Sequence, residues 1–284
     1  MNRKLPFLAL FSTTIVYGLT NILLRYAGSQ DYFSVVFFVL LFSTLMLLPG
    51  LVFSHGLGEM KSRHELRLVL PLGFFSAATW FLIYFAIMNT SIANAVLGYM
   101  TTPVFVIALS PFLLKERINI QVLIALALAL IGVTLIFDPR NLIRSIAPVG
   151  IISGMLAGVA SAMVEIIGRK LKDQYSPLSL TFFGTSVGTL ILLPFFLLNG
   201  SSIPSMNSLL IILLLSLGGI SGGTLLYYAL KHIIAQSVSI IMLLEPLISI
   251  VAAFILFLEI PSPLTVLGAG LLVAADVIII QKQP

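Results

Sequence analysis

Glu245 is the residue of this chain whose position most strongly indicates chemistry. It lies within Ser237–Phe257, an apolar segment with no other charged residue. A helix carrying this segment through a hydrocarbon core about 30 Å thick would place Glu245 close to the midplane. An ionisable side chain there costs about 2.5 kcal/mol or more, unless it faces water or takes up a proton. Two interpretations stay open: a site for a proton or a substrate ammonium, or a permanently protonated acid bonded to a backbone carbonyl that Pro246 leaves free.

Polar and aromatic side chains at helical spacing mark other apolar segments as walls of a candidate cavity. Tyr17 and Asn21 lie four residues apart, and so do Trp80 and Tyr84, so each pair occupies one face of a helix. Such faces would suit an aromatic or apolar compound with a polar head, although hydroxyls also hold packed helices together. The candidate substrate-binding residues are Tyr17, Asn21, Trp80, Tyr84, Tyr99, Thr102, Thr224, Tyr227, Tyr228 and Glu245. Glu245 is also the candidate coupling residue.

The other acidic residues near the apolar segments are expected to have structural roles. Glu165 precedes Arg169 by four residues, which predicts an ion pair within one helix. Glu116 and Glu259 are expected to cap or pin helix ends, and Asp276 to be structural. Close helix packing explains the glycines spaced four apart, which are Gly154/Gly158, Gly184/Gly188, Gly218/Gly222 and Gly219/Gly223.

Several kinds of chemistry are excluded by what the sequence lacks. The chain has no cysteine, and its three histidines lie in or beside charged connectors, so no metal site is predicted. Ser221 lies in a Gly-Ile-Ser-Gly sequence like that around the serine of rhomboid-type intramembrane proteases, but no histidine inside a span could act as its base. A Gly-x-x-x-x-Gly-Lys loop for ATP is also missing. We therefore expect neither an enzyme nor a cofactor.

The composition predicts an all-α polytopic membrane protein. Of 284 residues, 59% are hydrophobic and 9% are charged, against a usual charged share of about 25%. The mean hydropathy is +1.15. The net charge of +5 could suggest nucleic acid. We attribute it to membrane topology, because no soluble domain is present to carry a basic face, and we expect no nucleic-acid partner.

Uncharged runs divide the chain into ten predicted transmembrane helices. Two runs, Leu68–Leu114 and Gln174–Leu230, are too long for one span and must fold back. Their polar breaks are Asn89–Ser91 and Asn199–Pro204, which have loop chemistry. The remaining spans are Leu5–Leu24, Tyr32–Ser54, Ile118–Phe137, Ser145–Val164, 235–258 and 263–281. We interpret the first of them as a retained helix and not as a cleaved signal peptide.

The basic residues predict the orientation of these helices. If the N-terminus is inside, the inner connectors hold twelve basic residues and the outer connectors three, as the positive-inside rule requires. The inner residues are Arg3, Lys4, Lys61, Arg63, Arg67, Lys115, Arg117, Arg169, Lys170, Lys172, Lys231 and Lys282, and the outer residues are Arg25, Arg140 and Arg144. We therefore expect a multi-pass protein of the plasma membrane with both termini cytoplasmic.

The two halves of the chain repeat one another. A shift of 143 residues superimposes Pro103 on Pro246 and Glu116 on Glu259, and in the first part of each half the shift is 145. Because each half has five helices, the halves must enter the membrane in opposite directions. We expect one membrane domain built from two inverted five-helix repeats, residues 1–141 and 142–284, with the substrate site at the midplane between them.

The repeat carries a resemblance to a known family. Leu113–Asn119 (LLKERIN) closes helix four and Leu256–Ser262 (LFLEIPS) closes helix nine, and with ten spans in two repeats they resemble the EamA-like group of the drug/metabolite transporter superfamily. A glycine often precedes the glutamate of this motif in the family, where this chain has Lys115. The resemblance implies a cavity between helices one, three, four, six, eight and nine. It also implies export of small molecules, often amino acids or their derivatives.

Together these features predict a secondary transporter that works by alternating access. We expect it to export amino acids or related amine-bearing compounds, with proton coupling at Glu245. The alternatives are a membrane channel, for which no ring of like groups is visible, and a scaffold, which would not explain the polar faces. The expected partners are a small-molecule substrate, protons and the lipid bilayer. The sequence leaves the substrate, the direction and the choice of monomer or homodimer open.

Overall fold

The structure, a computed structural model, describes residues 4–26, 32–53, 63–90, 92–136, 148–198, 203–248, 251 and 262–282. Every regular element in these ranges is helical. Eight segments are long and apolar enough to cross a membrane, and Ile120–Ile136 and Ala235–Ile248 are shorter apolar helices. These ten segments correspond to the ten predicted spans, so the all-α architecture is confirmed.

The first half ends its third span where the polar break was predicted. Its helices are α1 (Lys4–Tyr26), α2 (Tyr32–Phe53), α3 (Arg63–Asn89), α4 (Ile92–Tyr99), α5 (Thr102–Leu113) and α6 (Ile120–Ile136). The N–H of Thr90 still donates to the carbonyl of Ala86 at 3.0 Å, and α4 begins two residues later. After α5 the chain turns at Lys115, whose φ of 59° lies in the left-handed region that favours glycine.

The second half also breaks where loop chemistry was predicted. Its elements are α8 (Pro148–Leu171), α9 (Pro177–Leu198), α10 (Met206–His232), α11 (Ala235–Ile241), the 3₁₀ turn η2 (Met242–Leu244) and α13 (Pro263–Lys282). Ser205 caps α10 by accepting a hydrogen bond from the N–H of Ser208. The predicted loop residues 199–202 and Glu259 lie outside the described residues.

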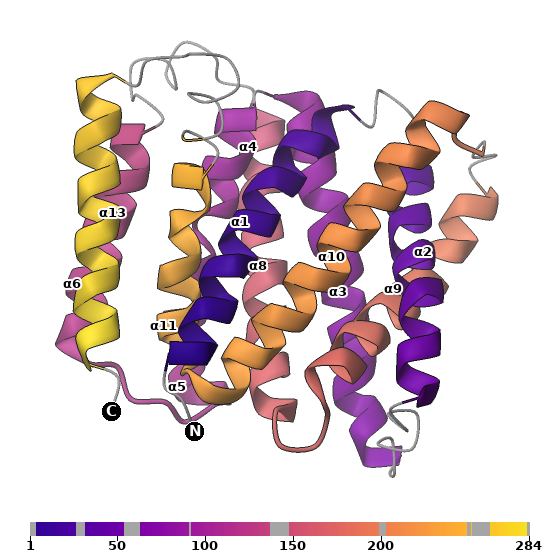
Figure 1. Cartoon of the computed structure of the whole chain (residues 1–284), viewed down its shortest axis with the longest axis horizontal. Helices are drawn as coiled ribbons and strands as arrows, with labels where there is room; N and C mark the ends of the chain where they lie inside the picture. Colours follow the sequence, from indigo (N-terminus) through magenta and orange to yellow (C-terminus); the bar gives the residue numbers. More distant parts are fainter. Residues whose placement is uncertain are drawn as a thin grey trace.

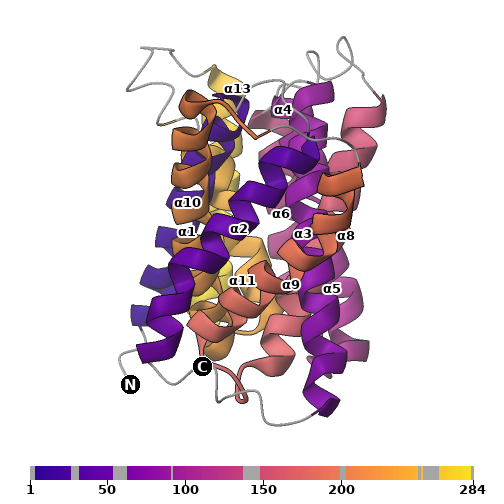
Figure 2. The same cartoon turned by 90° about the vertical axis from the view of Figure 1, so that its right-hand side faces the viewer.

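The halves are inverted with respect to one another. In Figure 1 the start of α1 and the end of α13 lie at the same face, and α1 and α8 run in opposite directions. Figure 2 shows the same bundle from the side, with its helices running between two opposite faces. Each half packs against the other through equivalent elements: α1 lies along α10 and α3 along α8, while α2 pairs with α9 and α6 with α13. The predicted inverted repeat is therefore confirmed.

Helix four is interrupted, although the sequence predicted one continuous span. It divides into α4 and α5 at Met100 and Thr101. Pro103 has no N–H, so the carbonyl of Tyr99, four residues earlier, loses its helical donor. The hydroxyl of Thr102 donates to that carbonyl at 2.7 Å. The Tyr99 carbonyl therefore receives its hydrogen bond from a side chain of helix four itself.

Helix nine is interrupted at the equivalent position. Helix α11 gives way to η2, and helical structure resumes from Glu245 to Ile248. Pro246 removes the donor for the carbonyl of Met242, and this carbonyl accepts instead from the backbone N–H of Glu245. Because of this local bond, the Met242 carbonyl does not need the Glu245 side chain.

Glycines allow α8 to lie close to the interruption of helix four. A Cβ added to Gly158 would stand 3.0 Å from both the carbonyl oxygen of Tyr99 and the hydroxyl oxygen of Thr101. A Cβ at Gly154 would meet the carbonyl of Ala95. The predicted role of these glycines in close helix packing is confirmed.

Candidate substrate cavity

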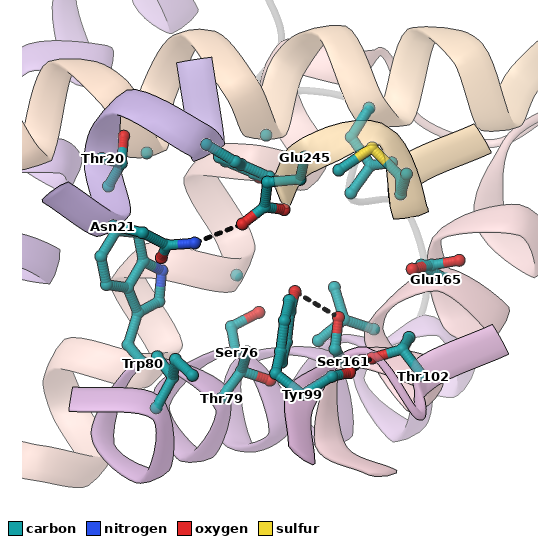
Figure 3. Close-up of a pocket in the computed structure, with 18 of the residues that line it drawn as sticks. Thr20, Asn21, Ser76, Thr79, Trp80, Tyr99, Thr102, Ser161, Glu165 and Glu245 are labelled. Atoms are coloured by element: carbon teal, nitrogen blue, oxygen red, sulfur yellow. Dashed lines mark hydrogen bonds between the residues drawn. The ribbon is translucent and has the colours of Figure 1, made fainter. Parts of the chain in front are cut away.

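A cavity lies at the centre of the bundle, between the two halves (Figure 3). It contains about 1110 Å³ of space not filled by atoms, part of it open to solvent. Its walls come from helices of both halves and include both interruptions, represented by Thr102 and Glu245. Residues of both halves of the chain therefore face one shared space.

Most of the predicted site residues meet in this cavity. The residues that line it are Tyr17, Asn21, Trp80, Tyr99, Thr102, Tyr227 and Glu245. They come from α1, α3, α4, α5, α10 and the residue following η2. The helices expected from the resemblance therefore do form the wall, and α9 contributes as well through Thr181 and Thr185.

Contrary to the prediction, three of the candidate binding residues do not line the cavity: Tyr84, Thr224 and Tyr228. Tyr84 is fully buried between helices, with its ring 5.8 Å from that of Tyr32. Ser76 and Trp80 of α3 line the cavity. Tyr84 comes eight residues after Ser76, which is more than two turns of 3.6 residues, so its side chain points to a different side of the helix. Adjacent residues of a helix point about 100° apart, and Tyr227 lines the cavity. Tyr228 therefore points elsewhere and packs its ring 4.9 Å from that of His232. The hydroxyl of Thr224 lies behind the wall, 3.2 Å from that of Thr181.

Glu245 is buried and is held by the opposite half of the molecule. Its Oε1 accepts a hydrogen bond from the side-chain amide of Asn21 (Figure 3). Its Oε2 has no partner among the described residues, and the residue is 2% exposed. The alternative of an acid bonded to a freed backbone carbonyl is not observed. Glu245 instead directs its carboxyl into the cavity.

The opposite wall presents aromatic and hydroxyl groups to this acid. The hydroxyls of Tyr99 and Ser161 lie 3.0 Å apart (Figure 3). Trp80 lies against α10, where a Cβ at Gly219 would stand 3.2 Å from its ring. Tyr17 similarly occupies the space that the missing side chain of Gly222 leaves. Glycines in α10 therefore seat two of the aromatic rings of the cavity.

The same stretch of α10 contains the serine that resembled a protease nucleophile. Ser221 is exposed, and its hydroxyl donates to the carbonyl of Leu217 at 2.7 Å. It is not among the residues that line the cavity. This geometry assigns Ser221 an ordinary helix-backbone bond.

Glu165 is placed differently from the prediction. Arg169 does not pair with it, because the Nε of Arg169 donates to Glu116 Oε1 at 3.1 Å. Glu165 lines the cavity instead, 3% exposed, and its Oε2 has no partner among the described residues. Glu165 and Glu245 are the charged residues of the described wall, which contains no lysine, arginine or histidine.

Arg169 and Glu116 form an ion-pair cluster at the face where α1 begins. Besides Glu116, Arg169 donates to the carbonyls of Leu230 at 2.6 Å and Lys231 at 3.3 Å. Glu116 also accepts from the N–H of Ala235 at 3.4 Å. The cluster ties together the end of α8, the link after α5 and the junction of α10 with α11. The prediction that Glu116 pins a helix end is confirmed.

Several wall residues were not among the predicted ones. They include Thr20, Thr79, Ser161, Thr181, Thr185, Met100 and Met242. The four-residue spacing of Thr181 and Thr185 was a usable signal in α9. The two methionines carry no such signal, because their side chains are ordinary core residues in sequence. Asp276 is buried in α13 and does not line the cavity.

Two inverted repeats around a central cavity, with interrupted helices at its midpoint, form the arrangement typical of secondary transporters. The chain belongs to the EamA-like transporter family, whose model matches residues 4–138 and again residues 148–281. The family and the suspected repeat are therefore established.

Relatives and solved structures extend this likeness over nearly the whole chain. An uncharacterized transporter of Archaeoglobus fulgidus is 30% identical over 276 residues, covering 97% of this chain and 96% of the relative. An S-adenosylmethionine uptake transporter of Rickettsia prowazekii is 27% identical over 275 residues, covering 95% and 90%. A solved crystal structure superimposes with a TM-score of 0.79 at 15% identity and covers 98% of both chains, which supports the fold alone.

Proposed function

We propose that this protein is an alternating-access secondary transporter for a small cationic metabolite with an aromatic part. The position of Glu245 carries this proposal. It is a buried carboxyl at the interruption of helix nine, one of its oxygens has no partner among the described residues, and it opens into a cavity without a described basic side chain. A cation would satisfy that oxygen, and the rings of Tyr17, Trp80 and Tyr99 would hold the aromatic part.

S-adenosylmethionine is the compound we would test first. It has an adenine ring and two positive centres, a sulfonium and an ammonium, which fit an acidic cavity with aromatic walls. The name of the Rickettsia prowazekii relative supports the same class of cargo, and that relative is named for uptake. The amino-acid cargo and the outward direction expected from the sequence have no such support.

Glu245 would also couple transport to protons. A single carboxyl cannot hold a proton and a cation together, so occupancy by one displaces the other. Alternating exposure of this site to the two sides would then exchange cargo for a proton. The ion-pair cluster around Arg169 supports gating at one end of the cavity and favours a carrier over an open channel.

We further propose a plasma-membrane location with both termini cytoplasmic. Support comes from the basic connectors. The α5–α6 link and the ends of α8 and α10 lie at the face where α1 begins (Figure 1), and in the sequence they carry Lys115, Arg117, Lys172 and Lys231. Cysteines introduced at Ser62 and Ser202 of this cysteine-free chain would report the orientation with an impermeant maleimide on intact cells. Labelling of Ser202→Cys alone is expected, and labelling of Ser62→Cys alone would contradict the orientation.

Counterflow in proteoliposomes tests the proposed function. Vesicles loaded with unlabelled S-adenosylmethionine should take up external radiolabelled compound transiently and saturably, whereas unloaded vesicles should not. A channel would give non-saturable uptake without any stimulation by loading. A scaffold would give no uptake above that of protein-free vesicles.

A further inference from the structure

The cavity contains a second acid for which one bound cation provides no partner. Glu165 lies on α8 and Glu245 follows η2, and both line the same space (Figure 3). Each is more than nine-tenths buried, and each has one carboxyl oxygen without a partner among the described residues. Because an unpartnered buried carboxylate is costly, two of them in one cavity require two neutralising charges.

No described group of the protein supplies the charge that Glu165 lacks. Arg169, one turn away on α8, is held by Glu116 and by the carbonyl of Leu230. The other titratable groups that line the cavity are Tyr17 of α1, Tyr99 of α4, Tyr227 of α10 and Glu245, and none of them is basic.

The two acids lie apart in the cavity, Glu245 above Tyr99 and Glu165 to its right in Figure 3. The rings of Tyr17 and Tyr99 line the same cavity as both carboxyls. A ligand in contact with Tyr99 would therefore lie near both acids. Such an arrangement suits a molecule whose positive centres lie apart.

The acids are also confined to one half of the repeat. The sequence shift of 145 residues pairs Glu165 with Thr20, and the shift of 143 pairs Glu245 with Thr102. Both threonines line the same cavity. Equivalent positions therefore present hydroxyls from the first half of the chain and carboxyls from the second half.

We propose that Glu165 is a second cation subsite, so that each of the two acids of the loaded cavity has a positive centre or a proton beside it. The inference rests on the proposed function and deepens it. One charge is bound at Glu245, which Asn21 orients, and the other at Glu165. The second charge comes either from a second positive centre of the cargo or from a proton that travels with it.

Two ligands that differ by one charge test this subsite. S-adenosylmethionine has a sulfonium, an ammonium and a carboxylate, whereas S-adenosylhomocysteine lacks one methyl and therefore has no sulfonium charge. Binding of both to the purified full-length protein would be measured by calorimetry for the wild type, Glu165→Gln and Glu165→Asp. Tyr84→Phe, outside the cavity, is the control. A pH-sensitive dye in proteoliposomes would give the number of protons moved per cargo.

The two sources of charge give different results. If the cargo supplies the second charge, Glu165→Gln weakens S-adenosylmethionine about tenfold or more and S-adenosylhomocysteine less than about twofold. Glu165→Asp should restore most of the difference. If a proton supplies it, both affinities persist but Glu165→Gln moves one proton fewer per cargo.

A Glu165→Gln protein that matches Tyr84→Phe in both affinities and in the proton count would overturn the subsite. It would leave the proposed function intact, because Glu245 would still bind the cargo. If the wild type bound neither ligand and moved no protons, the proposed function would fail, and the subsite with it.

Discussion

The two interrupted helices occupy equivalent places in the repeat, yet they use their polar residue in opposite ways. In the first half, Thr102 turns back and donates to the carbonyl of Tyr99 that Pro103 leaves free. In the second half, the freed carbonyl of Met242 is satisfied by backbone. Glu245 is therefore available to the cavity, where Asn21 of the other half holds it.

This difference explains how a symmetric fold obtains an asymmetric site. Proline lies at the interruption of both helices, so each half of the fold contains one interrupted helix. At the equivalent positions of the two interruptions, the cavity is lined by the hydroxyl-bearing Thr102 in the first half and by the carboxyl-bearing Glu245 in the second. The first break is a structural element of the cavity wall, and the second is the proposed cation site.

The largest expected effect comes from replacing Glu245 with threonine, the residue at the equivalent position of helix four (Thr102). Glu245→Thr should lower S-adenosylmethionine affinity about 100-fold, because a buried charge interaction is lost. Thr102→Val should lower it only about threefold, and should also cost about 1 kcal/mol of stability by leaving the Tyr99 carbonyl unpaired. Calorimetry and thermal unfolding would measure these effects. Similar affinity losses in the two variants would contradict the asymmetry.

A smaller effect is expected at the ion-pair cluster, which we propose as a gate at the end of the cavity near Glu165. Arg169→Gln removes the bond to Glu116 and those to the carbonyls of α10, so this end should open more often. The alkylation rate of a cysteine at Ser110, now fully buried, should rise about tenfold, which corresponds to about 1.4 kcal/mol of lost closure. Lys170→Gln, an exposed neighbour, is the control, and an equal rate in both would contradict the gating role.

The aromatic wall should make a more modest contribution. Trp80→Ala should weaken an aromatic cation about fivefold, within the range of a cation–π contact. Tyr84→Phe should have no effect on affinity, because Tyr84 lies between helices outside the cavity. Fluorescence of Trp80, which is the sole tryptophan, should be quenched by cargo in the Tyr84 variant as in the wild type. Equal affinity losses in the two variants would favour a packing role for Trp80.

The smallest effect concerns the packing of the first break. Gly158→Ala would place a methyl 3.0 Å from the Tyr99 carbonyl oxygen, and the required shift should cost about 1 kcal/mol of stability. Gly270→Ala, in α13, meets nothing within 4 Å and should be neutral or slightly stabilising. Thermal unfolding in one detergent would compare them. A neutral Gly158→Ala would show that α8 does not support the break.

The sequence predicted the scaffold well because its signals are local. Charged and polar residues such as Asn89 end apolar runs, and the shared prolines Pro103 and Pro246 expose the repeat. Counting residues through an apolar segment singled out Glu245 as a midplane acid, and the structure places it in the cavity wall. These features depend on residue type and spacing alone, so the sequence is sufficient to predict them.

Contacts between distant segments could not be predicted in this way. Arg169 was assigned to Glu165, four residues away, because nothing in the sequence indicates Glu116, which lies 53 residues earlier and folds beside it. Tyr84 was assigned to the cavity because the rotation of α3 about its axis depends on its packing partners. The bond between Asn21 and Glu245 joins residues 224 apart, and only the packed halves bring them together.

The pH dependence of cargo binding tests the central claim most directly. If proton and cargo compete for Glu245, the dissociation constant of S-adenosylmethionine for the wild type should rise as the pH falls, by up to about tenfold per pH unit. Glu245→Gln should bind weakly with a much shallower dependence on pH, since its amide cannot titrate. Wild-type binding that is independent of pH from 5 to 8, or a Glu245→Gln protein with the wild-type profile, would contradict the account.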